Sequence, residues 1–118
     1  MAASDSRLSI VQRQVGDVTI LDVSGKITIG VGDVAIRDAV HVALGGGARD
    51  ILLNLKSVST IDSAGVGELV SAYTTVTHRG GKLKLLNLPE KVNDILQITQ
   101  LITVFEVYDS EEEAIRSF

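Results

Sequence analysis

The sequence predicts an α/β protein with a mixed sheet of four to five strands and about four helices, in the order ββ(β)αβαβαβα. Three observations support this fold class. Two runs near the start, 8–15 and 18–23, are rich in β-branched residues and are joined by a short turn. An amphipathic helix is expected between the apolar runs 51–55 and 83–88. The last third of the chain continues the alternation of helix and strand. The 118 residues, 45% of them hydrophobic, suit a single domain spanning residues 1–118.

The chain is expected to begin with an antiparallel pair of strands. Residues 8–15 and 18–23 are rich in β-branched side chains, and Gly16 and Asp17 between them are typical of a hairpin turn. The glycine-bracketed segment 25–32 that follows favours either a brief strand or a loop.

The first helix is predicted over residues 33–44, because its apolar residues recur on one helical face. They are Ile36, Val40, Ala43 and Leu44. Asp33 and Arg37 have the spacing of an i,i+4 ion pair. Gly45–Gly47 is expected to end the helix, and no Gly-Lys-Ser/Thr follows that would make it a P-loop.

A βαβ unit is predicted in the middle of the chain. The nearly continuous apolar run 51–55 is typical of a strand covered on both faces, and 83–88 is the next strand. The helix between them has an apolar face and a face expected in solvent. The apolar face carries Val66, Leu69, Val70, Tyr73 and Val76, and the solvent face Glu68, Ser71, Thr75 and His78. A right-handed crossover places the end of the first strand and the start of this helix at one sheet edge, where ligand and partner sites are common.

The last third is predicted to add a helix, a short strand and a final helix. Pro89 and Glu90 suit a helix start, and residues 104–108 read as a strand. Ser110 and Glu113 have capping-box spacing for the terminal helix. The residues expected to face inward from the two helices are Val92, Ile95, Leu96, Thr99, Ala114, Ile115 and Phe118.

Composition excludes several classes of function. A net charge of -4 leaves no excess of Lys and Arg for phosphates, so nucleic acid is not an expected partner. The chain has no Cys and two His, which removes disulfides, thiolate zinc sites and thiol nucleophiles. No Asp and Glu spacing matches a calcium loop, and no stretch reaches the apolar length of a membrane helix. We therefore expect a cytoplasmic protein without a metal, a cofactor or membrane insertion.

No catalytic constellation is found, so the chain is not expected to be an enzyme. Ile61 stands two residues before Ser63, where a nucleophile elbow requires glycine. His41 and His78 fall on predicted solvent faces. Asp62 has the position of a phosphoacceptor, but the acidic cluster of receiver domains is missing.

The stretch Ser59 to Gly67 is the most informative part of the sequence. Asp62 and Ser63 precede an apolar helix and have a plain role as N-caps. The helix start is also rich in small residues, and its two glycines, Gly65 and Gly67, together cost roughly 1.5 to 2 kcal/mol relative to alanine. Such a helix start is tolerated where another surface must approach closely, which favours an accessible Ser63 hydroxyl.

Together with the preceding strand 51–55 and the closing Gly80-Gly81, the segment Asp62-Ser63-Ala64-Gly65-Val66-Gly67 resembles the STAS domain of bacterial anti-sigma factor antagonists. The resemblance covers essentially the whole chain. It implies the STAS fold and a switch centred on Ser63.

In that family the serine matching Ser63 is phosphorylated by an anti-sigma factor with serine kinase activity, and a PP2C-type phosphatase reverses the modification. The unphosphorylated antagonist binds the anti-sigma factor and frees the sigma factor. The resemblance implies a partner surface formed by Asp62, Ser63, Ala64, Gly65 and Gly67 together with Thr28.

Thr28 is a departure from the family pattern, because many members carry Asp at this position. It is either a second candidate hydroxyl or an ordinary β-branched strand residue. Two other functions stay open from the sequence. One is a non-switching STAS subunit, such as a lipid-transporter accessory or a signalling scaffold, and the other is a small enzyme or nucleotide-binding protein.

Overall fold

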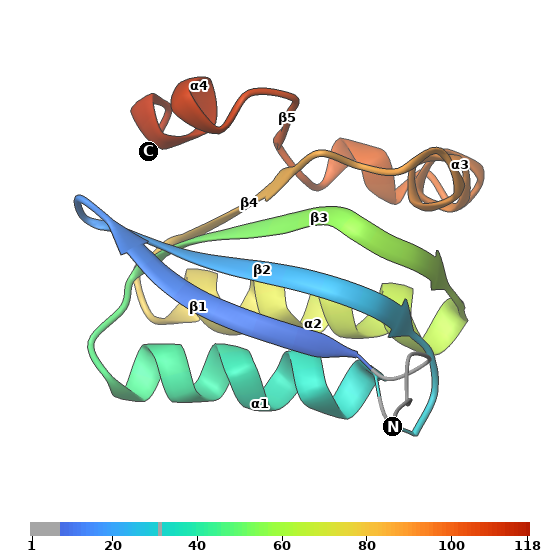
Figure 1. Ribbon diagram of the computed structural model, residues 1–118, viewed down its shortest axis with the longest axis horizontal. Helices are drawn as coiled ribbons and strands as arrows, with labels where there is room; N and C mark the ends of the chain where they lie inside the picture. The colour runs from blue at the N-terminus through green and yellow to red at the C-terminus, as the bar shows by residue number, and fades with distance from the viewer. Residues whose placement is uncertain (1–7, 31) are drawn as a thin grey trace, which may run out of the picture.

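The computed structural model describes residues 8–30 and 32–118 and shows the predicted order of elements (Figure 1). The elements are β1 (Ser9–Val15), β2 (Val18–Ile27), α1 (Gly32–Gly45), β3 (Asp50–Ile61), α2 (Ser63–His78), β4 (Lys82–Leu86), α3 (Glu90–Ile98), a 3-10 turn η1 (Leu101–Thr103), β5 (Val107–Tyr108) and α4 (Glu111–Arg116). The predicted α/β class is confirmed. For the segment 25–32, which was expected to form a brief strand or a loop, the structure shows that β2 continues to Ile27 and that a loop follows.

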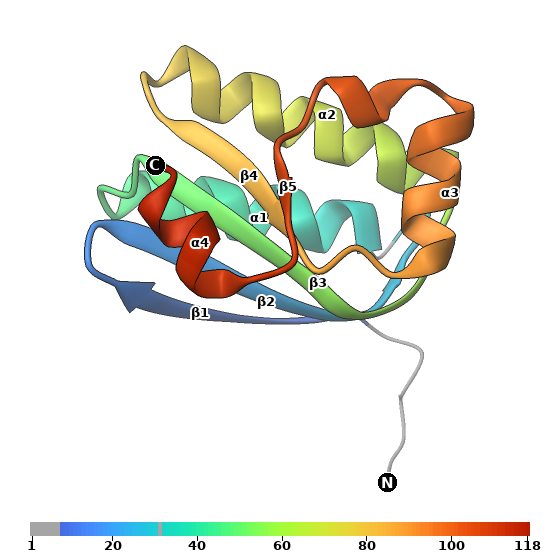
Figure 2. The same ribbon diagram turned by 90° about the horizontal axis from the view of Figure 1, so that it is seen from above.

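The strands form one sheet in the order β1-β2-β3-β4-β5, in which β1 and β2 are antiparallel and the other neighbours are parallel. Gly16 takes a φ of 60° in the hairpin turn, a conformation that glycine adopts at no steric cost. Helices α1 and α2 lie side by side against one face of the sheet, and α4 lies over the opposite face (Figures 1 and 2). Ile27 and Ile61, the last residues of β2 and β3, are paired, so the two strands end together beside the starts of α1 and α2.

The alternation of side chains along β3 divides the core into two parts. Ile51, Leu53 and Leu55 belong to the larger cluster with α1 and α2, whereas Leu52 belongs to the smaller cluster with Ala114 of α4. Four of the five residues from 51 to 55 are 0% exposed, as expected of a strand covered on both faces, and the exception is Asn54.

Glu68 is buried, so its predicted solvent position was wrong. The side chain is 8% exposed because α1 packs along the flank of α2 that carries it, and Arg37 of α1 lies 3.3 Å from its carboxylate. The predicted partner of Arg37, Asp33, instead accepts the backbone N–H groups of Gly30 and Val34. Sequence spacing could not reveal an ion pair that joins two helices.

The C-terminal third differs from prediction in detail. The expected strand 104–108 is limited to Val107 and Tyr108, because Phe105 turns into the core and meets Tyr73 edge to face at 5.6 Å between ring centroids. Thr99, expected to face inward, is exposed as the C-cap of α3. The capping box is confirmed in part, since the Ser110 hydroxyl accepts the Glu113 N–H at 3.3 Å.

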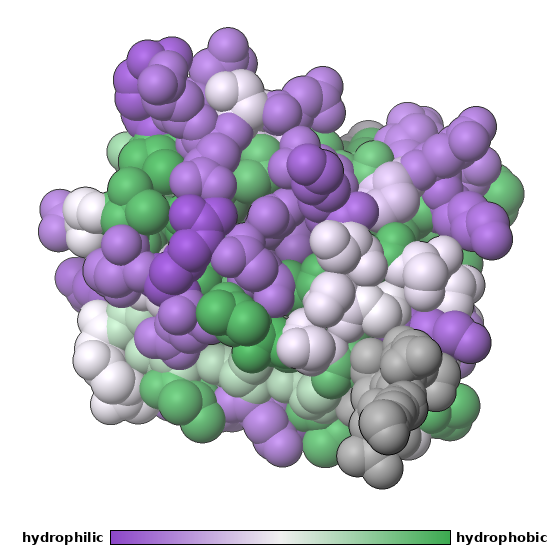
Figure 3. Space-filling model, in the orientation of Figure 1, coloured by the Kyte–Doolittle hydropathy of each residue, from purple (hydrophilic) through white to green (hydrophobic). Residues whose placement is uncertain are grey.

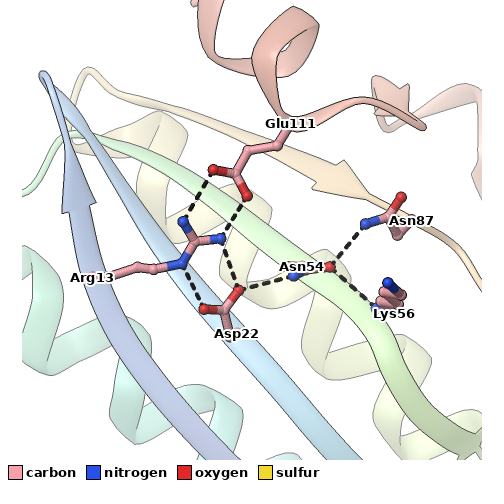
Figure 4. Close-up of polar contacts among 6 residues, drawn as sticks. All are labelled: Arg13, Asp22, Asn54, Lys56, Asn87 and Glu111. Atoms are coloured by element: carbon pink, nitrogen blue, oxygen red, sulfur yellow. Dashed lines mark hydrogen bonds and ion pairs between the residues drawn. The ribbon is translucent and has the colours of Figure 1, made fainter.

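A chain of polar contacts ties α4 to the sheet (Figure 4). The Arg13 guanidinium donates to the carboxylates of Asp22 and Glu111, with a shortest distance of 2.6 Å to each. Asn54 donates to Asp22 at 2.9 Å and accepts from Asn87 at 3.3 Å. These contacts hold α4 against the face of the sheet that α1 and α2 do not cover.

Within residues 8–30 and 32–118, every helix is too short or too polar to cross a membrane.

Candidate functional site

The Ser63 segment lies where the parallel strands end, as the crossover argument predicted. Asp62 follows β3 directly and its backbone N–H donates to Ile27 O, the last residue of β2, at 3.3 Å. Ser63 is the first residue of α2. The site is therefore built from two strand ends, two helix starts and the loop between β2 and α1.

Asp62 caps α2 and also holds the loop after β2. Its backbone is extended, and its Oδ1 accepts the Gly65 N–H at 2.9 Å while its Oδ2 accepts the Ile29 N–H at 3.0 Å. These N–H groups, Ile29 first and Gly65 second, hold the pKa of the Asp62 carboxyl below its usual range. The site therefore contains a fixed negative charge at neutral pH.

Ser63 is exposed at the first helical position. Because Asp62 supplies the cap, the helix start does not require the Ser63 hydroxyl for that purpose. The N-cap role considered for both residues thus falls to Asp62. An exposed hydroxyl at a helix start is accessible to the active site of another protein, and the dipole of α2 tolerates an anion there.

The two glycines of this turn have different surroundings. A Cβ on Gly65 would lie 2.2 Å from Ile27 O, so glycine lets α2 pack against the end of β2. A Cβ on Gly67 would meet no atom within 4 Å, so no internal contact requires glycine there. Gly67 instead keeps the exposed side of the first turn flat, next to the partly exposed Ala64.

Thr28 lies at the same edge, just beyond the end of β2. Its carbonyl accepts the backbone N–H groups of Gly32 and Asp33 at 3.0 and 3.2 Å, which closes the turn before α1. Gly30 donates to the Asp33 carboxylate at 2.9 Å. The structure thus brings Thr28 together with Asp62 through the intervening Ile29.

Two apolar residues of this surface were not among the predicted site residues. Ile29 is 74% exposed although its backbone is anchored to Asp62, and Val34 in the first turn of α1 is 37% exposed. An apolar residue inside a glycine-bracketed loop was the available signal for Ile29. Because the Ile29 backbone is already anchored, less of this loop has to be ordered on binding, which makes the exposed side chain a suitable contact for a partner protein.

The site has no base beside Ser63 among the groups considered from the sequence. His41 and His78 are both exposed, and His78 ends α2 at the opposite end from Ser63. Among the described residues, no three His, Asp or Glu side chains lie close enough together to hold a metal ion.

Comparison with known proteins assigns the family. The family model of the STAS domain matches residues 9–114. The chain belongs to the STAS domain family.

The similarity to known proteins covers nearly the whole chain. The anti-sigma-B factor antagonist of Bacillus subtilis is 29% identical over 106 residues, which cover 90% of this chain and 94% of that protein. The crystal structure of TM1081 from Thermotoga maritima has a TM-score of 0.83 at 28% identity and covers 92% of both chains. The phosphorylated form of Bacillus SpoIIAA, with a TM-score of 0.71 at 23% identity over 92% of this chain and 98% of that one, shares the fold.

Proposed function

We propose that this STAS domain is an anti-sigma factor antagonist switched by phosphorylation of Ser63. Its unphosphorylated form binds an anti-sigma factor that has serine kinase activity, and a PP2C-type phosphatase restores that form. The protein acts in the cytoplasm as a single regulatory domain, residues 1–118, and not as an enzyme. The name and the 90% coverage of the Bacillus subtilis relative support this proposal.

The observation that carries the proposal is the separation of two roles at the start of α2. Asp62 provides the cap, and Ser63 presents an exposed hydroxyl beside it. A phosphate on Ser63 leaves the cap bonds of Asp62 in place, so the domain stays folded. The modification therefore acts on binding and not on folding.

Electrostatics explains how one phosphate prevents binding. It adds about -1.5 to -2 charges next to the ionised Asp62, on a chain whose net charge is already -4. A partner that fits the unmodified surface has to desolvate this charge and lacks cations placed to pair with it. A loss of ~3 kcal/mol weakens association more than a hundredfold.

The surface around Ser63 has the composition of a protein contact. Ile29 and Val34 supply apolar area, Gly67 and Ala64 allow a close backbone approach, and Asp62 and Thr28 add polar groups. Gly65 is buried and contributes indirectly, because its lack of a side chain allows α2 to pack closely against the end of β2.

Substitution of Ser63 tests the proposal. The Ser63→Ala variant is expected to bind the anti-sigma factor and resist phosphorylation, and Ser63→Asp to bind at least tenfold more weakly. Ser71→Asp adds the same charge on an exposed position two turns further along α2 and serves as the control. Isothermal titration measures binding, and mass spectrometry after incubation with kinase and ATP locates the phosphate. Wild-type binding by both Ser63 variants contradicts the switch.

A further inference from the structure

Two consecutive backbone amides in the loop after β2 are held by carboxylates from two different helices. The Ile29 N–H donates to Oδ2 of Asp62, the cap of α2, at 3.0 Å. The Gly30 N–H donates to Oδ1 of Asp33, in the first turn of α1, at 2.9 Å. The exposed Ile29 side chain therefore extends from a dipeptide that is tied to both helix starts.

The bond to Asp33 matters because Gly30 has little conformational preference of its own. Gly30 has a φ of 94°, which glycine adopts without steric cost, but glycine visits many other conformations as readily. A Cβ at this position would meet no atom within 4 Å, so the space around it is open. The hydrogen bond to Asp33 is therefore well placed to select this conformation next to Ile29.

The Asp33 carboxylate is itself held in place. Its Oδ1 also accepts the Val34 N–H at 2.8 Å, and the backbone N–H of Asp33 donates to Thr28 O at 3.2 Å. Among the described residues, the second oxygen of Asp33 accepts no hydrogen bond, whereas both oxygens of Asp62 accept one. Asparagine can therefore replace Asp33 without loss of either acceptor bond, but it cannot replace Asp62 in that way.

The surface at this edge of the sheet suits an apolar contact. In the view of Figure 3, the residues over the ends of β2 and β3 are mostly of intermediate hydropathy, whereas hydrophilic residues gather over α3 and α4. Ile29 is 74% exposed at the same edge, so the direction of its side chain decides what it can contact. Such a side chain contributes to binding when it meets a matching apolar site on the partner.

We propose that Asp33 is a positioning residue of the partner surface, which holds Gly30 and thereby sets the direction in which Ile29 meets the anti-sigma factor. The identity of the partner rests on the proposed function, whereas the hold on Gly30 does not. Asp33 also lies where a negative charge favours the dipole of α1. That second role depends on charge and not on an acceptor atom, so the two roles respond differently to asparagine.

Amide exchange tests the hold on Gly30. Asp33→Ala removes the acceptor and is expected to speed hydrogen exchange of the Gly30 amide by about tenfold, as measured by NMR. Asp33→Asn keeps Oδ1 and should leave this exchange within about threefold of wild type. Asp38→Ala removes the same charge from an exposed position on the same helix and is the control.

Binding tests whether this hold acts through Ile29. Asp33→Ala is expected to weaken association with the anti-sigma factor by about three- to tenfold, because the dipeptide then has to be ordered on binding. Asp33→Asn should restore most of the affinity. In a chain that already carries Ile29→Ala, Asp33→Ala should change the affinity by less than about twofold, since little side chain remains to be positioned. Isothermal titration of the wild type, the single variants and the double variant measures these affinities.

Three results overturn the positioning role of Asp33. The first is unchanged exchange of the Gly30 amide in Asp33→Ala, and the second is a loss in Asp33→Asn as large as that in Asp33→Ala. The third is an effect of Asp33→Ala on affinity that is as large with Ile29→Ala as without it. A wild-type chain that does not bind the anti-sigma factor refutes the proposed function instead, and the exchange measurements still decide whether Asp33 holds Gly30.

Discussion

The Ile29 backbone N–H donates to Asp62 Oδ2 at 3.0 Å, so the carboxylate that caps α2 also anchors the loop after β2. This bond joins residues 33 positions apart in the sequence. It fixes the position of the Ile29 backbone relative to the start of α2, although the Ile29 side chain itself is 74% exposed.

Replacement of Asp62 is expected to release this loop. In Asp62→Asn one acceptor oxygen becomes an NH2 group, so the side chain can no longer accept from both Ile29 and Gly65. Faster hydrogen exchange of the Ile29 amide, measured by NMR, is the expected result. Asp38→Asn, on an exposed position of α1, is the control and leaves this exchange unchanged. Equal exchange of Ile29 in both variants contradicts the anchoring role.

Acid is expected to release the same anchor. The pKa of Asp62 is held low by the backbone N–H groups of Ile29 and Gly65, so these bonds favour the folded state while the group is ionised. Their contribution is complete above the ordinary Asp pKa of about 3.9 and is lost as the pH falls through the lower pKa of the folded protein. The Ile29 amide shift should titrate with this lower pKa, whereas a midpoint at or above the ordinary value contradicts the assignment.

The two glycines of α2 are expected to respond oppositely to alanine. Gly65→Ala forces a Cβ against Ile27 O and should lower the free energy of unfolding by roughly 1–3 kcal/mol. Gly67→Ala meets open space and should raise it by up to about 1 kcal/mol, because alanine favours the helix. Urea unfolding of both variants provides the comparison. A similar loss of unfolding free energy in the two variants contradicts the explanation from their different surroundings.

The fold could be predicted because each element has a strong local pattern. The apolar run 51–55, the hairpin turn at Gly16 and the helical spacing from Val66 to Val76 lie in the expected elements. The placement of Asp62 and Ser63 at the strand ends followed from the handedness of the crossover. These features depend on residues close together in the chain.

The errors arose where distant segments meet. Glu68 is buried by α1, and the strand expected from residue 104 gives way to a turn because Phe105 packs against Tyr73. Ile29 was missed for the same reason, since its role depends on a bond to Asp62. Single-sequence patterns contain no record of such contacts between elements.

The Ile29 side chain is expected to contribute to partner binding and not to stability. Ile29→Asp places a charge in the apolar part of the surface and should weaken binding of the anti-sigma factor at least tenfold. The side chain is 74% exposed, so the unfolding free energy should change by less than about 0.5 kcal/mol. Ile98→Asp, at a position 81% exposed at the end of α3, is the control. Equal binding by the two variants contradicts this role.

The Arg37–Glu68 pair is expected to matter through the buried carboxylate. Arg37→Met leaves Glu68, 8% exposed, without this partner and should cost about 1–3 kcal/mol of unfolding free energy. Adding Glu68→Met should recover most of the loss, because the buried charge is removed. A double variant no more stable than Arg37→Met, in thermal or urea unfolding, contradicts this explanation.

The ion pairs of Arg13 are expected to make stability depend on pH. Hydrogen bonds from the Arg13 guanidinium lower the pKa of both Asp22 and Glu111, so their ionised forms stabilise the folded chain. This contribution is complete above their ordinary pKa values of about 4 and is lost as the pH falls through the lower folded-state values. Because the side chains are 32–38% exposed, solvent screening limits each pair to about 0.5–1 kcal/mol. Arg13→Met should therefore lower stability at pH 7 more than at pH 2, as measured by urea unfolding at both values. An equal loss at the two pH values means that packing of the Arg13 stem, and not its charge, holds α4 to the sheet.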